Sequence, residues 1–188
     1  MTYEEFLHAI RSAAAVASVD ELLVFGSQAI LALNPDPPAA LKQSVELDVV
    51  PYRHPERWEA IDGQLGEQSQ FHLTHGFYVQ GVGFETATFP ARWETRCLRV
   101  PVGRPPIVVI CPELHDLAAS KLAAGRDKDF SYVSVLIEHE LIDTHKLIRR
   151  VAKLPVPPDE RVRLRAWIGA VANGLSRRRT PNHDSTAE

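Results

Sequence analysis

The sequence lacks long apolar runs and has little cysteine. No apolar run in the 188 residues approaches the roughly twenty that a helix needs to cross a bilayer, so we expect no membrane partner. The N-terminus has no basic start followed by an apolar segment, which predicts a cytoplasmic location. Only two cysteines are present, Cys97 and Cys111, each beside an apolar, strand-like run. They predict buried free thiols and not a disulfide or a zinc site.

An excess of either charge is also missing from the whole chain, which has 21 Lys or Arg and 24 Asp or Glu. The charge is unevenly divided, however. Residues 146–188 hold ten Lys or Arg against four Asp or Glu, a net charge of +6, and residues 1–145 carry −9. A basic end favours a polyanionic partner such as tRNA. The alternative is a solvated amphipathic helix, since apolar residues recur there at helical spacing: Val162, Leu164, Trp167, Ile168 and Val171.

The length suits one well-packed domain, or a small α/β core with a helical extension, but not two full-sized domains. Thr2 and Glu5 form a predicted capping box that opens a helix ending near Val16. We predict an α/β core over residues 1–112, a helical C-terminal part over 113–175 packed on that core, and a polar, disordered tail over 176–188.

Gly26-Ser27 interrupts an apolar run, Leu22 to Phe25, before a helix-competent run. This pattern predicts a strand that feeds a helix through a turn whose backbone N–H groups converge. Glycine allows an anion close to the backbone, and the serine hydroxyl adds a donor, so the turn could hold a phosphate. The alternative is an ordinary turn in which Ser27 is the N-cap of the helix.

Glu46 and Asp48 lie in a predicted strand that runs from Val45 to Val49. Because side chains alternate in a strand, the two carboxylates share one face. Two carboxylates together with substrate phosphates are ligands that suit Mg²⁺. The alternative is an edge strand with a solvated polar face.

Lys121, Gly125 and Asp129 recur every four residues, which on a continuous helix would place them along one face. There a lysine could neutralise triphosphate charge, with the aspartate orienting it. The alternative is a surface helix with ordinary salt bridges. For the charged run of Arg126, Asp127 and Lys128 we expect a solvated face.

The order of these motifs resembles the nucleotidyltransferase superfamily. Phe25-Gly26-Ser27 and Glu46-Leu47-Asp48-Val49 match its signature, with Glu46 where the family usually has Asp. The stretch from Asp116 to Phe130 resembles the AbiEii toxin-like branch, and further phrases, including residues 61–66 and 89–93, resemble the related DUF6036-type family. The likeness covers roughly residues 20–145.

The resemblance implies an α/β (α+β) nucleotidyltransferase fold with a small mixed sheet flanked by helices. It implies transfer of a nucleoside monophosphate from an NTP to an acceptor hydroxyl of RNA, such as a tRNA end, by a toxin that a cognate antitoxin protein restrains. Carried onto this sequence, the catalytic residues are Asp48, Lys121 and Asp129, and the nucleotide-binding residues are Gly26, Ser27 and Lys121. Mg²⁺ or Mn²⁺ would be the cofactor, with metal ligands at Glu46, Asp48 and Glu85. The alternative for Glu85 is an exposed glutamate of a strand.

Two other functions stay open. The substitution of Glu46 for Asp would suit a nucleotidyltransferase-fold protein that binds a partner with weak or no catalysis. The same core with a different acceptor pocket would suit a transferase for a small hydroxylated molecule such as an aminoglycoside. The sequence does not identify the NTP, the acceptor, the oligomeric state or the antitoxin.

Overall fold

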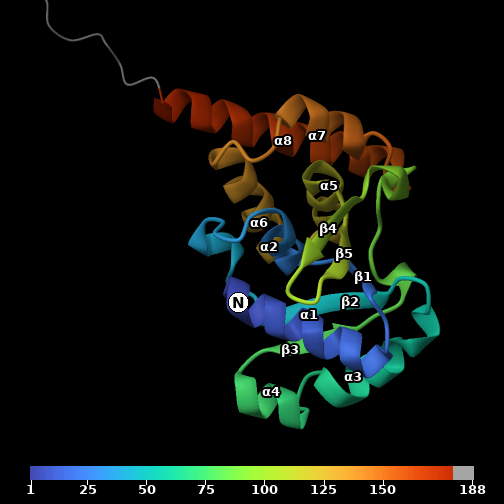
Figure 1. Ribbon diagram of the computed structural model, residues 1–188. Coiled ribbons are helices and arrows are strands. Elements are labelled where there is room, and N and C mark those ends of the chain that lie inside the picture. Colours follow the sequence, from blue (N-terminus) through green and yellow to red (C-terminus); the bar gives the residue numbers. More distant parts are fainter. Residues whose placement is uncertain (180–188) are drawn as a thin grey trace, which may run out of the picture.

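The computed structural model describes residues 1–179, with side chains over residues 1–175 (Figure 1). The α-helices are α1 (Tyr3–Ala17), α2 (Ile30–Leu33), α3 (Trp58–Leu65), α4 (Gln70–His75), α5 (Leu114–Ala124), α6 (Asp127–Glu138), α7 (Thr144–Val151) and α8 (Pro158–Arg179). The strands are β1 (Glu21–Val24), β2 (Glu46–Pro51), β3 (Tyr78–Gly81), β4 (Leu98–Val102) and β5 (Ile107–Cys111). Five 3₁₀ turns link them: η1 (Ser27–Ala29), η2 (Ala39–Leu41), η3 (Pro55–Arg57), η4 (Phe84–Thr86) and η5 (Trp93–Arg96).

The strands form one mixed sheet in the order β3-β2-β1-β5-β4. β1 runs parallel to β5 and antiparallel to β2, and β2 runs parallel to β3. The C-terminal end of β1 therefore lies beside the middle of β2, with Val24 opposite Val49. Together with the helices, this sheet confirms the predicted α+β class, and it places β2 inside the sheet, not at its edge.

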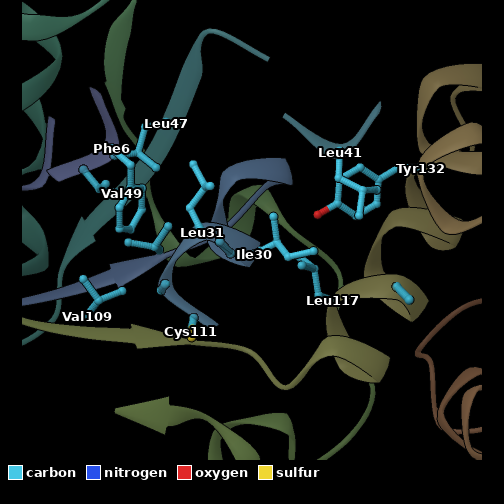
Figure 2. Close-up of a cluster of buried hydrophobic side chains, with 14 of the residues drawn as sticks. Phe6, Ile30, Leu31, Leu41, Leu47, Val49, Val109, Cys111, Leu117 and Tyr132 are labelled. Carbon is cyan, nitrogen blue, oxygen red and sulfur yellow. The ribbon is translucent and has the colours of Figure 1, made fainter. Parts of the chain in front are cut away.

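One face of the sheet is covered by α1, which crosses it in Figure 1. The capping box predicted at Thr2 and Glu5 is present at the start of this helix. Phe6 and Ile10 of α1 are fully buried in the same cluster as Leu47 and Val49 of β2 (Figure 2). This core continues through Leu117 of α5 and Tyr132 of α6 to α8, so the predicted helical part shares one core with the α/β part.

The opposite face of the sheet is covered by residues 82–97, which we call the strap. Phe89 and Trp93 of the strap stack with ring centroids 4.2 Å apart, and both rings contact Phe25 at the end of β1. Leu23, Val50 and Ile110 complete this smaller cluster. Because Glu46, Asp48 and Val50 alternate with the α1-facing residues of β2, the two carboxylates lie on the strap side of the sheet.

Cys97 and Cys111 are free thiols, as predicted, and burial raises the pKa of each to about 12. No helix within residues 1–179 has the length and apolar content needed to span a membrane. At the C-terminus, α8 continues through Arg179, four residues into the segment predicted as a tail. The rest of that segment, residues 180–188, lies outside the described residues.

Candidate active site

The site is built around a turn at the end of β1. Gly26 has a φ of +66°, a value that favours glycine, and a β-carbon there would collide with the Asp48 carboxylate. The N–H of Phe25 donates to the carbonyl oxygen of Asp48 at 3.0 Å, which fixes the turn against β2. Gly26 is the N-cap of η1. Ser27 is therefore not the N-cap that the alternative interpretation of this turn required.

Lys121 reaches the turn from the last turn of α5. Its ammonium nitrogen donates to Ser27 Oγ at 2.9 Å and lies 3.1 Å from Asp129 Oδ1. Both partners are buried, with exposed fractions of 6% for Lys121 and 1% for Asp129. Burial lowers the pKa of Lys121, and the neighbouring Asp129 carboxylate opposes that change. A charged amine is thus held beside the serine hydroxyl.

Asp48 and Glu46 lie on the same side of β2, opposite Gln80 and Tyr78 of β3. Burial, and then the negative charge of Glu46, raises the pKa of Asp48 to about 6, although Lys121 favours its charged form. Two carboxylates on one face of a strand form a place where a cation is stabilising. Within the described residues, no group of three or more His, Cys, Asp or Glu side chains could hold a metal ion. A divalent cation here would have two protein carboxylates, which is the usual arrangement when Mg²⁺ also binds water and substrate phosphates.

These groups open into one cleft of about 870 Å³, a size within the usual range for small-molecule sites. Gly26, Ser27, Glu46, Asp48 and Lys121 all line it. Its other walls are the η2 region, residues 86–89 of the strap, and the start of α6.

A family model described as "Nucleotidyltransferase of unknown function (DUF6036)" matches residues 4–168. The chain belongs to this family. No curated protein and no solved structure matches the chain.

In this DUF6036 protein, Lys121 and Asp129 lie on two different helices, α5 and α6. The two residues do not lie on one continuous helix, because α5 ends at Ala124 and Gly125 adopts a left-handed φ of +72°. α6 then begins at Asp127, and the corner between the two helices brings the side chains together. Asp129 consequently lies in the first turn of α6, where a carboxylate is favoured by the helix dipole.

Arg126, expected on a solvated face, is a partner of Asp129. Its Nε donates to Asp129 Oδ2 at 2.6 Å, and its Nη2 donates to Oδ1 at 3.3 Å. Burial alone would raise the pKa of Asp129, but the bonds from Arg126 and the ammonium of Lys121 hold it below its usual value. Arg126 and Lys128 also line the cleft, so two side chains of the charged run belong to the site.

Glu85, the predicted third metal ligand, is not brought to the other carboxylates. It lies in η4 of the strap and not in a strand, its side chain is exposed, and its carboxylate folds back over Gly83. It is not among the residues that line the cleft.

Tyr132 is a site residue that the sequence patterns did not predict. Its hydroxyl donates to the carbonyl oxygen of Ser27 at 2.8 Å, and its ring centroid lies 4.5 Å from the Lys121 nitrogen. Ser27 and Tyr132 are 105 residues apart in the chain. The position of Tyr132, three residues after Asp129 on a helix, indicates a shared face but not a contact with the turn.

Proposed function

We propose that this cleft transfers a nucleoside monophosphate from an NTP to an acceptor hydroxyl. The observation that carries the proposal is the bond between Lys121 and Ser27, because it joins the two groups suited to hold a triphosphate, next to a carboxylate pair suited to a divalent cation. Gly26 and Ser27 would bind phosphate oxygens, and Lys121 would neutralise charge that develops on the leaving pyrophosphate. Asp129, with Arg126, would orient Lys121.

Mg²⁺ or Mn²⁺, bound by Glu46 and Asp48, would supply charge neutralisation and Lewis-acid activation of the phosphate. The long Glu46 side chain can fill the position at which the superfamily usually has Asp. With a cation present, ionisation of Asp48 is favoured, which offsets its raised pKa.

For the acceptor we propose RNA, such as the end of a tRNA, with growth inhibition held in check by an antitoxin protein. Support comes from the resemblance to AbiEii-like toxins and from the basic C-terminal region. Part of that region is already neutralised, since Lys146 lies 3.1 Å from Glu113 and Arg150 lies 3.1 Å from Asp116. The exposed cations left to meet RNA phosphates include Arg149, Lys153 and Arg165.

The test incubates the purified protein and Mg²⁺ with each α-labelled NTP and total RNA. We expect label on RNA from the native chain, and loss of at least a hundredfold in rate with Asp48→Ala, because a metal ligand is removed. Asp127→Ala, which removes an exposed carboxylate at the start of α6, is the matched control and should retain activity.

The other outcomes of this test would favour a competing function or contradict the role of Asp48. Label on an aminoglycoside but not on RNA would favour a small-molecule transferase. Tight NTP binding that is insensitive to Mg²⁺ and gives no transfer would favour a non-catalytic binding protein. Equal transfer by the native chain and by Asp48→Ala would exclude Asp48 from the reaction.

A further inference from the structure

Tyr132 contacts both residues that the proposed function places on the triphosphate. Its hydroxyl bonds to the backbone of Ser27, its ring lies under the ammonium of Lys121, and that ammonium bonds to the Ser27 hydroxyl. The three contacts form a closed triangle between η1, α5 and α6. Tyr132 is 6% exposed and belongs, with Leu41, to the buried cluster drawn in Figure 2.

The hydroxyl and the ring of Tyr132 make different interactions. A buried hydroxyl is costly without a partner, and here its hydrogen bond is directed to the Ser27 carbonyl oxygen. Burial raises the pKa of Tyr132, so the phenol stays neutral and remains a donor. The ring presents its negative face to a buried cation, an interaction that is stronger where water is excluded.

We propose that Tyr132 is a positioning residue that sets the phosphate-binding turn and the Lys121 ammonium at a fixed separation. The hydroxyl holds the turn, and the aromatic ring holds the ammonium. This inference rests on the proposed function in one respect, the assignment of Ser27 and Lys121 to the triphosphate.

Two variants separate the two roles. Tyr132→Phe keeps the ring and removes the bond to the turn, so we expect the affinity for Mg²⁺-tripolyphosphate to fall about tenfold, the effect of removing one hydrogen bond. The pKa of Lys121 should stay near its native value. Tyr132→Leu removes the ring as well, and we expect the pKa of Lys121 to fall further, by about half a unit or more.

Calorimetry with tripolyphosphate measures the affinity, and NMR of ¹³C-lysine-labelled protein measures the pKa. The charged groups that act on Lys121 are Asp129, Arg126 and Asp48, and all stay in place in both variants. Leu136→Ala is the control for core damage, because Leu136 is fully buried one turn further along α6. It should change the unfolding midpoint without changing either readout.

Unchanged tripolyphosphate affinity in Tyr132→Phe, or an unchanged Lys121 pKa in Tyr132→Leu, would overturn the proposal. So would a shift of either readout in Leu136→Ala as large as in the Tyr132 variants. Failed label transfer with these binding and pKa effects intact would reject the nucleotidyl-transfer reaction alone. A native chain that does not bind tripolyphosphate would reject both the phosphate site and the role of Tyr132 in it.

Discussion

Asp48, a ligand of the cation in the proposed function, lowers the stability of the metal-free protein when it is ionised. Its carboxylate is partly buried beside Glu46, and its pKa rises from an ordinary value of 3.8 to about 6. A group whose pKa is higher in the folded state stabilises the fold below its unfolded pKa and loses that contribution as the pH rises through the folded value. Near neutral pH the ionised Asp48 therefore costs up to about 3 kcal/mol when no cation is bound.

We therefore predict that Asp48→Asn stabilises the metal-free protein at pH 7.5, because asparagine does not ionise. The gain in unfolding free energy should approach about 3 kcal/mol at pH 7.5 and shrink towards pH 4, where the native carboxyl is protonated. Urea unfolding of both proteins across this pH range measures the difference.

The exposed Asp127→Asn variant is the control for a general charge effect and should show no comparable gain. Mg²⁺ should raise the midpoint of the native chain and leave that of Asp48→Asn nearly unchanged. A variant that is less stable than the native chain at every pH would contradict the account of Asp48.

At the scale of elements, ion pairs with one buried carboxylate of α5 hold the strap in place. Asp116 is fully buried, accepts two bonds from Arg96 of the strap at 2.6 and 2.8 Å, and lies 3.1 Å from Arg150 of α7. The strap in turn lines the cleft with residues 86–89. The ion cluster thus ties a wall of the cleft to the helix that carries Lys121.

Asp116→Ala should destabilise the protein by about 3–5 kcal/mol, because it leaves two arginines close together without their shared carboxylate. The rate of amide hydrogen exchange should increase, relative to the native chain, more in residues 86–97 than in α1. Adding Arg96→Leu to this variant should restore part of the stability, since it removes one unpaired cation. Equal exchange in the strap of the native chain and of Asp116→Ala would contradict the proposed tie.

Local signals in the sequence predicted several elements and site residues. Gly26, Ser27 and the carboxylate strand are short-range patterns, and the structure has the turn directly after β1 and the carboxylates on the adjacent strand, β2. The four-residue repeat around Gly125 did not show how Lys121 and Asp129 meet, because such a repeat cannot distinguish a continuous helix from two helices that meet at a left-handed glycine. Arg126 is exposed, as its charged run predicted, but that pattern did not predict its bond to Asp129.

At the scale of the whole molecule, the resemblance to nucleotidyltransferases predicted the mixed sheet and its helices but not which distant residues they bring together. The order of the strands, the course of the strap and the contact of Tyr132 with Ser27 depend on packing between distant segments. Such contacts leave no local pattern, since the chain positions of the partners are set by the folded core.

The uneven charge of the molecule predicts separate sites for NTP and RNA. Replacing Arg149, Lys153 and Arg165 by Gln should weaken RNA binding about tenfold or more. The slope of the logarithm of the RNA-binding constant against the logarithm of the salt concentration should also become shallower, by about one for each phosphate that the variant no longer neutralises. The affinity for NTP should be unchanged. Titration of labelled RNA at several salt concentrations measures the RNA affinity and its salt dependence.

The matched control replaces three other exposed arginines, Arg11, Arg92 and Arg104, by Gln, which changes the net charge equally. It should affect RNA binding less than the C-terminal triple variant. Equal weakening by the two triple variants would show that net charge, and not the basic end, controls RNA binding.

The central claim is that the turn, the carboxylates and Lys121 form one metal-dependent NTP site. A crystal structure with Mg²⁺ and a non-hydrolysable NTP tests it most directly. We predict phosphate oxygens within hydrogen-bond distance of Ser27 and Lys121, and the cation bound by Asp48 and Glu46. A nucleotide bound away from Ser27, or a cation that does not contact Asp48, would contradict the claim.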